Sequence, residues 1–194
     1  MTGNSGTELS PLPDLLRPEL ELVFVGINPG IESARTGHYF AHPRNRFWPA
    51  ANAAGIFNPE LSPETGHLAE LQGIGFTDIV KRPTPSASNL KVSDFREGAD
   101  RLQSNLLKFS PLLICFNGMT AYSNYLRHAE GITVRADFGE QHRMIGRSRV
   151  FVVPSPSPAN AAFSLQHLID SYSAVQRLRT QLVTARQDSA VTRG

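Results

Sequence analysis

The side chains of this chain that could carry out chemistry gather in one short stretch, residues 26–48. It opens on a Gly-Ile-Asn-Pro-Gly turn, and the amide of Asn28 in such a turn either holds a water molecule or stabilises the turn itself. Aromatic rings and arginines follow: Tyr39, Phe40, Arg44, Arg46, Phe47 and Trp48. The rings either pack in the core or, beside guanidinium groups, form a wall for a planar ligand. The stretch therefore indicates a ligand-binding site.

Several other kinds of site are absent from the sequence. It has no Gly-x-x-x-x-Gly-Lys-Ser/Thr phosphate loop, no Gly-x-Ser-x-Gly turn and no Gly-x-Gly-x-x-Gly motif. The single cysteine, Cys115, excludes a disulfide within the chain, and its apolar neighbours favour a buried thiol over a nucleophile. The histidines lack metal-ligand spacing, so we expect neither a metal nor a cofactor. They are His38, His42, His67, His128, His142 and His167.

Short apolar strands alternate with helices along the chain. The expected strands are Glu21–Gly26, Gly75–Val80, Pro111–Phe116 and Val150–Val153. The expected helices are Asn45–Ala54, Ser62–Leu71, Asp94–Phe109, Asn117–Leu126 and Asn160–Val183, with an extended or hairpin segment over 131–149. This alternation predicts an α/β fold with a mostly parallel sheet covered by helices on both faces. The turn-rich segments at 26–30 and 154–158 should then meet at one edge of the sheet.

The length and composition fit one globular domain. The chain has 194 residues, of which 40% are hydrophobic and 19% charged, with a net charge of +2. We expect a flexible leader at 1–18, a catalytic domain at 19–186 and a flexible tail at 187–194. The chain has neither a secretory signal nor an apolar run of about 18 residues, so we expect an intracellular protein without a membrane partner. The net charge alone does not imply nucleic acid.

Four blocks of the sequence, in colinear order, resemble the mismatch-specific uracil/thymine-DNA glycosylases. The blocks are GINPG at 26–30, TGHYFAHPRNRFW at 36–48, GFTDIVKRPTPS at 75–86 and FREGA at 95–99. The resemblance implies a three-layer α/β/α sandwich that flips uracil, or a mispaired thymine or related damaged pyrimidine, out of DNA. It further implies hydrolysis of the N-glycosidic bond, in base-excision repair, by a monofunctional enzyme without a lyase step. If the source is bacterial, the enzyme would act on the nucleoid.

The resemblance also implies roles for individual residues. Asn28 matches the asparagine that positions the hydrolytic water, and Phe40 matches the aromatic ring that stacks on the flipped base. Backbone groups around Ile27 and Phe40 would read the pyrimidine edge, with Gly30 and Tyr39 also in the base-binding set. Because an amide is a poor general base, catalysis would depend on positioning and on stabilising the departing pyrimidine anion.

The loop after the last strand departs from the family pattern. Ser157, Pro158, Ala159 and Asn160 stand where relatives carry small residues and an arginine wedge. A shorter plug should fill the vacated stack less well, so we expect weaker dependence on an opposite guanine. Arg44, Arg46 and Lys81 are the candidate phosphate contacts, and duplex or single-stranded DNA is the expected partner of a monomeric enzyme.

Asp94 opens a helix near the expected cleft. Its carboxylate either compensates the helix N-terminus or activates water, and Asp78 is the weaker candidate for the second role. Two other functions remain open for the chain as a whole. One is a hydrolase or transferase that acts on a free nucleoside or nucleotide. The other is a DNA-binding module without catalysis.

Overall fold

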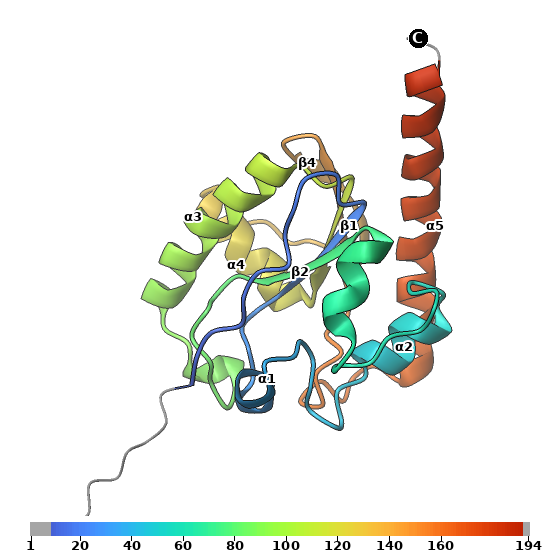
Figure 1. Cartoon of the computed structure of the whole chain (residues 1–194). Coiled ribbons are helices and arrows are strands. Elements are labelled where there is room, and N and C mark those ends of the chain that lie inside the picture. Colours follow the sequence, from blue (N-terminus) through green and yellow to red (C-terminus); the bar gives the residue numbers. More distant parts are fainter. Residues whose placement is uncertain (1–8, 192–194) are drawn as a thin grey trace, which may run out of the picture.

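A five-stranded sheet runs through the centre of the molecule in the order β2-β1-β3-β5-β4 (Figure 1). The computed structural model describes residues 9–191. The strands are β1 (Leu22–Gly26), β2 (Ile74–Asp78), β3 (Leu113–Asn117), β4 (Gly139–Ile145) and β5 (Ser148–Val153). Strands β2, β1, β3 and β5 are parallel, and β4 pairs with β5 in the antiparallel sense at the edge. Every residue of β1, β2 and β3 is buried, as expected for strands covered on both faces.

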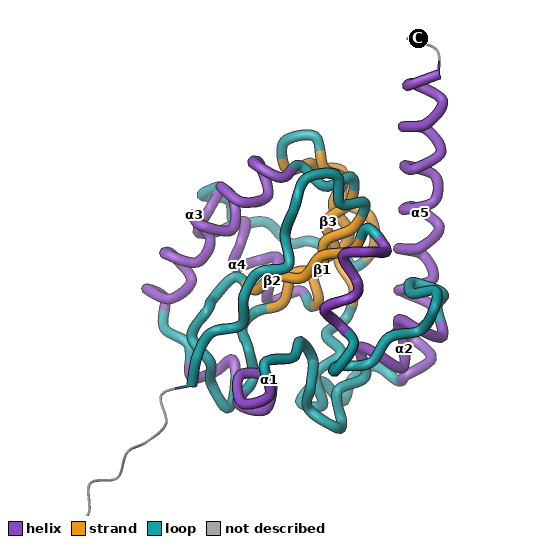
Figure 2. Tube along the Cα trace, viewed as in Figure 1, coloured by secondary structure: helices purple, strands orange, loops and turns teal. Residues whose placement is uncertain are grey.

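Helices cover both faces of this sheet (Figures 1 and 2). The α-helices are α1 (Ile31–Thr36), α2 (Phe47–Ala53), α3 (Val92–Phe109), α4 (Met119–Ala129) and α5 (Leu165–Val191). Two 3-10 helices, η1 (Gly66–Gln72) and η2 (Ala87–Asn89), complete the set. Helices α3 and α4 pack together on one face, and α2 and α5 pack together on the other. The α/β/α sandwich with a mostly parallel sheet is thereby confirmed.

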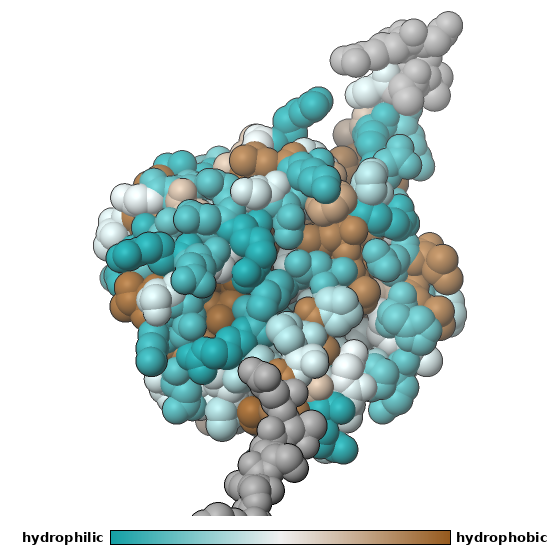
Figure 3. Space-filling view, turned by 60° about the vertical axis from the view of Figure 1, so that its left-hand side comes forward, coloured by the Kyte–Doolittle hydropathy of each residue, from teal (hydrophilic) through white to brown (hydrophobic). Residues whose placement is uncertain are grey.

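The two hydrophobic cores follow from the alternation of side chains along each strand. Phe24 and Phe76 point to the face covered by α2 and α5, where they meet Phe47 and Tyr172. Val23 and Val25 point to the opposite face. The buried residues contributed there by α3 have the predicted helical spacing and are Phe95, Ala99, Leu102 and Leu106. The outer surface on the α3 side is mostly hydrophilic, so α3 is an amphipathic covering helix (Figure 3).

The structure differs from the expectation in several helical regions, and α1 and η2 were not among the expected helices. The segment expected as a helix at 62–71 forms the 3-10 helix η1, which begins at Gly66, ends at Gln72 and is followed by Gly73 in the left-handed conformation. The last helix begins at Leu165 instead of Asn160, because residues 155–160 form a hydrogen-bonded loop. It runs to Val191, so the part of the expected tail that the structure describes is helical. Among the described residues, no helix is both long and apolar enough to span a lipid bilayer.

Residues 12–17, which the sequence assigned to the leader, lie against the sheet. Leu12 is buried, and Leu15 exchanges two backbone hydrogen bonds with Phe76 of β2 at 2.9 and 3.1 Å. The segment therefore forms a short antiparallel strap along the outer edge of β2. Residues 1–8 and 192–194 lie outside the described part of the chain.

Candidate active site

The carboxyl ends of the parallel strands bring the predicted loops together at one edge of the sheet. Helix α1, which follows β1, the loop after β2 and the loop after β5 all lie at the lower end of Figure 1. Backbone hydrogen bonds join the first two, because Ile27 accepts from Val80 at 2.8 Å and Pro29 accepts from Thr84 at 3.2 Å. Open α/β sheets bind their ligands at such an edge.

The amide of Asn28 is held in one orientation by the loop after β2. Its Nδ2 donates to Thr84 Oγ1 at 2.8 Å, to the Arg82 carbonyl at 3.0 Å and to the Pro29 carbonyl at 3.1 Å. Thr84 is buried, and its hydroxyl in turn donates to the Ser86 carbonyl at 2.8 Å. No described residue donates a hydrogen bond to Asn28 Oδ1. The half-buried Asn28 thus presents a fixed acceptor at the strand end.

Phe40 is supported by a stack of aromatic rings. Its ring lies nearly parallel to that of Phe47, with centroids 4.0 Å apart, and remains half-buried. Its backbone has φ of 54°, a left-handed conformation that costs a residue with a side chain about 1 kcal/mol or more. A strained aromatic residue on a rigid support is typical of a functional position.

Tyr39 is buried beside this stack. Its ring stacks on Phe76 at 5.3 Å, its hydroxyl donates to the Pro13 carbonyl at 3.1 Å, and its carbonyl accepts from the indole of Trp48 at 3.0 Å. Burial, and secondarily the nearby Asp78 carboxylate, raise the pKa of Tyr39, so the phenol stays protonated. Tyr39 therefore forms a neutral, immobilised part of the wall.

Asp78 ends β2 on the same face of the sheet as Phe76, directly beside Gly26. A Cβ atom added to Gly26 would stand 2.2 Å from Asp78 Oδ1, so the glycine leaves the room that the carboxyl group occupies. Burial raises the pKa of Asp78 to about 7, against a smaller lowering effect of Lys81. A buried carboxyl group with a pKa near neutrality is half-protonated at neutral pH and can donate a hydrogen bond.

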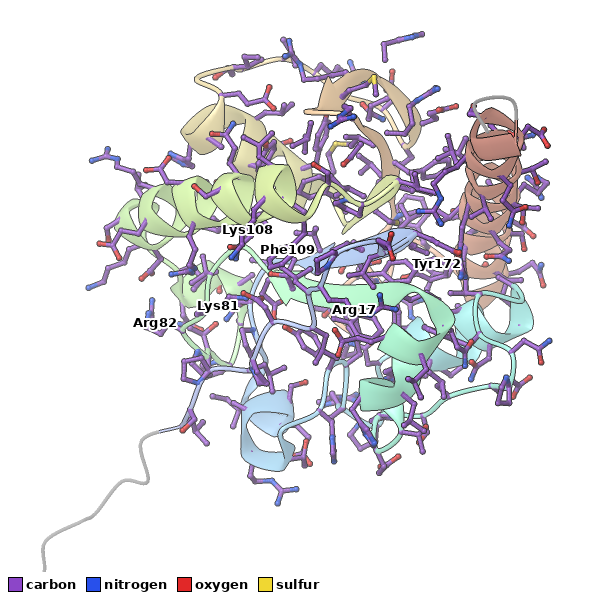
Figure 4. The ribbon with its side chains drawn as sticks, turned by 45° about the horizontal axis from the view of Figure 1, so that its top comes forward. Arg17, Lys81, Arg82, Lys108, Phe109 and Tyr172 are labelled. Carbon is purple, nitrogen blue, oxygen red and sulfur yellow. The ribbon has the colours of Figure 1, made fainter. Side chains whose placement is uncertain are left out.

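Lys81 and Arg82 follow β2 and lie close together in Figure 4. The Lys81 ammonium is bound by Asp14 of the N-terminal strap, and it also donates to Thr77 Oγ1 at 3.2 Å. Arg82 pairs with Asp94 at 2.6 Å. Both cations therefore have carboxylate partners within the chain.

The loop after β5 is organised around Arg46. Its guanidinium donates to the Phe163 carbonyl, to the Asn160 carbonyl at 2.6 Å and to the Ser157 carbonyl at 3.3 Å. Pro158 and Ala159 are exposed at the tip of this loop. The Arg46 guanidinium thus stabilises the conformation of the loop.

Two further contacts complete the surroundings of this loop. Gly118 at the end of β3 adopts a left-handed φ of 112°, and a Cβ there would approach Ser155 Cβ to 3.1 Å. The close approach lets the loop pack directly on the strand end. Arg44 is exposed, and among the described residues no carboxylate pairs with its guanidinium.

The Asp94 carboxylate is engaged in two structural contacts. It accepts from Arg82 at 2.6 and 3.3 Å and from the Lys91 backbone N–H at 2.7 Å, the hydrogen bond that caps α3. Hydrogen bonding to Arg82 is the main cause that lowers the pKa of Asp94. Since the Arg82 carbonyl accepts from Asn28, Asp94 connects to the turn through Arg82.

Two cavities lie beside the strap and beside α5. Within residues 9–191, no group of three histidine, cysteine or acidic side chains converges as metal ligands. A cavity of about 100 Å³ lies between the strap, residues 37–39 and residues 63–67, and a larger one of about 440 Å³ lies beside α5, near the start of β1.

The sequence indicated Asp78 only as the weaker candidate for activating water, and it did not single out Thr84 or Asn117. Asn117 ends β3 on the same face, accepts a hydrogen bond from Tyr172 at 2.8 Å, and leaves its buried Nδ2 without a partner in the described chain. The available signal was positional, because Asp78 and Asn117 are the polar residues that terminate otherwise apolar strands.

Comparison with known families identifies the superfamily of this chain. A model of the uracil DNA glycosylase superfamily matches residues 13–178, which is most of the chain. The chain belongs to the uracil DNA glycosylase superfamily. Members of this superfamily are DNA glycosylases, and this chain is therefore a hydrolase that acts on DNA bases. The edge that carries Asn28, Phe40 and Asp78 is its candidate active site.

A solved structure supports the fold of this glycosylase. The chain is similar to the solution NMR structure of a candidate uracil DNA glycosylase from Methanosarcina acetivorans, with a TM-score of 0.57 and 23% sequence identity. The match covers 88% of this chain and 98% of the other. The match extends over nearly the whole of the relative, so the two chains share a fold.

Proposed function

We propose that this glycosylase removes uracil from DNA, and that it does so with a water molecule held by Asn28. The observation that carries the proposal is the orientation of the Asn28 amide. Three acceptors hold its Nδ2, so Oδ1 is left as the available acceptor. A water that donates one hydrogen to Oδ1 directs a lone pair elsewhere, toward the anomeric carbon of the flipped nucleotide. The amide removes no proton, so its contribution is positioning.

Phe40 would stack on the flipped base. The ring has a firm support, because Phe47 lies beneath it at 4.0 Å and Phe47 is itself buried. A base that leaves the duplex loses its neighbours, and a preformed aromatic surface replaces part of that stacking. Tyr39 closes the wall, and Ile27 offers backbone groups at the strand end.

Asp78 would contact the base edge as a protonated acid. Its carboxyl group can donate to a pyrimidine carbonyl and accept from the ring N–H, a pair that uracil and thymine both present. As the glycosidic bond breaks, negative charge develops on the departing pyrimidine. A neutral donor stabilises that charge, whereas a carboxylate repels it, so the protonated form of Asp78 is the active one.

Duplex DNA would be held by the loop after β5 and by exposed cations. Arg46 shapes the loop, and Ser157, Pro158, Ala159 and Asn160 present a small plug to the duplex. Because this plug is short, we propose that cleavage depends only weakly on an opposite guanine. Arg44 is the exposed candidate for a phosphate contact, and Lys81 would have to exchange its contact with Asp14.

Asp94 would act as a positioning residue. Its carboxylate already accepts from Arg82 and from the α3 N-terminus, and the Arg82 carbonyl holds Asn28. We therefore place Asp94 behind Asn28, with the water activated by position and not by a carboxylate base.

One substrate panel tests this function. The purified enzyme is incubated with uracil opposite guanine, uracil opposite adenine, uracil in a single strand and free deoxyuridine, and abasic sites or free uracil are measured. We expect release of uracil from all three DNA substrates at comparable rates. Release from free deoxyuridine alone would assign a nucleoside hydrolase. Binding of uracil-containing duplex without release would assign a DNA-binding module, and strong guanine dependence would contradict the argument from the short loop.

A further inference from the structure

The N-terminal strap brings the carboxylate of Asp14 to the hydroxyl of Thr77 and the ammonium of Lys81, which lie one residue before and three residues after Asp78. Asp14 Oδ1 accepts from Thr77 Oγ1 at 2.5 Å and from Lys81 Nζ, and the same Nζ donates to Thr77 Oγ1 at 3.2 Å. The three groups form a closed triangle. Both side chains of the Asp14–Lys81 pair are largely buried, with 23% and 18% of their areas exposed, so the contact is shielded from solvent.

The hydrogen bonds to Asp14 and Thr77 fix the position of the Lys81 ammonium. Lys81 lies three residues after Asp78 and is the nearest cation to act on it, whereas Asp14 acts in the opposite sense. Yet the ammonium contacts Asp14 and Thr77, and no described residue forms an ion pair with Asp78. On the remaining sides Asp78 meets Gly26, which has no side chain, and the neutral Tyr39. Asp14 therefore offsets part of the effect that the Lys81 charge has on Asp78.

We propose that Asp14 is a positioning residue: by binding Lys81, it keeps the ammonium away from Asp78 and leaves Asp78 able to donate a hydrogen bond to the flipped base. The proposal rests on the proposed function, in which Asp78 contacts the base. The strap would then contact the site at two points, because the Pro13 carbonyl also accepts a hydrogen bond from the Tyr39 hydroxyl at 3.1 Å.

Two substitutions with opposite effects test the proposal. In Asp14→Asn the negative charge disappears and Lys81 is released toward Asp78, so Asp78 should lose its proton at lower pH. In Lys81→Met the positive charge disappears, so Asp78 should keep its proton to higher pH. A shift of about one pH unit in each direction is expected for removing one charge near a buried carboxyl group. A merely structural role would not produce shifts of opposite sign.

The titration can be read without activity. Protein labelled with ¹³C at the aspartate carboxyl groups gives a signal for Asp78, which its absence in Asp78→Asn assigns, and the midpoint of that signal is followed in each variant. Single-turnover excision at saturating enzyme is followed over the same pH range. At pH 7, Asp14→Asn should cleave about fivefold more slowly than the wild type, and at pH 5 the two should match.

The outcomes distinguish the role of Asp14 from the proposed release of uracil. Unchanged NMR midpoints in both variants, or shifts of the same sign, would overturn the proposal. A uniform loss of excision in Asp14→Asn at every pH, with an unchanged midpoint, would also overturn it. If the midpoints shift as expected but the wild type releases no uracil, the proposed function fails while the effect of Asp14 on Asp78 stands.

Discussion

Replacing Asp78 by asparagine should stabilise the protein, and the gain should grow with pH. The Asp78 carboxyl group is buried at the end of β2, and its pKa rises from 3.8 to about 7 on folding. Below 3.8 both folded and unfolded chains hold the proton, so the group adds no pH dependence. Between 3.8 and 7 the unfolded chain ionises first, and the free energy of unfolding falls as pH rises. Above pH 7 the folded protein bears the full free-energy cost of burying the ionised Asp78 carboxylate.

The magnitude follows from the shift. About three pKa units correspond to about 4 kcal/mol, and relaxation of the native state around the ionised group makes about 2–4 kcal/mol the expected range. An asparagine fills the same space beside Gly26 without titrating. The stability of Asp78→Asn relative to the wild type should therefore increase by that amount between pH 4 and pH 8.

Urea unfolding followed by circular dichroism at pH 4, 5, 6, 7 and 8 measures the difference directly. Asp100→Asn, at an exposed position on α3, is the matched control. A difference between Asp78→Asn and the wild type that stays flat from pH 4 to pH 8 would refute the reasoning. Asp78 would then be ionised in the folded protein throughout.

Three further predictions concern the site. Phe40→Ala should weaken the apparent affinity for uracil-containing DNA about 5- to 150-fold in single-turnover titrations, because one base–aromatic stack contributes about 1–3 kcal/mol; unchanged affinity would remove Phe40 from the site. Arg46→Met should expose the loop after β5 to limited proteolysis and reduce affinity for duplex more than for single-stranded substrate, since its guanidinium joins three loop carbonyls. Asp94→Ala and Arg82→Ala should slow excision to a similar, partial extent; a large loss in Asp94→Ala with a normal Arg82→Ala enzyme would instead assign a catalytic carboxylate.

The fold could be predicted from the sequence because β1 and β3 are almost entirely apolar and α3 and α4 are amphipathic. LVFV before Gly26 and LICF before Asn117 are continuous apolar runs of strand length, and such runs indicate buried parallel strands. The helix at 62–71 was less accessible. Its Gly66 lies where a Cβ would stand 2.9 Å from the Trp48 ring, a tertiary contact that no local pattern records.

The candidate site could be predicted only in part from the sequence, because its polar groups are oriented by hydrogen-bond partners that are distant in sequence. The motif around Asn28 identified the turn, but the hydrogen bond to Thr84 spans 56 residues and decides which end of the amide is available. The strap was assigned to the leader since its prolines and leucines have no strand periodicity. The position of the strap is set by the pairing of Leu15 with Phe76. This pairing brings Asp14 to Lys81.

The central claim is that Asn28 holds the hydrolytic water, and single-turnover excision by Asn28→Ala tests it most directly. Uracil opposite guanine in a duplex is the substrate, and binding to the same duplex is measured alongside. We predict a rate about 10²- to 10³-fold below the wild type with little change in affinity, because the residue acts on the transition state. Thr84→Val, which loosens the amide without removing it, should fall between the two. Excision by Asn28→Ala at the wild-type rate would contradict the account.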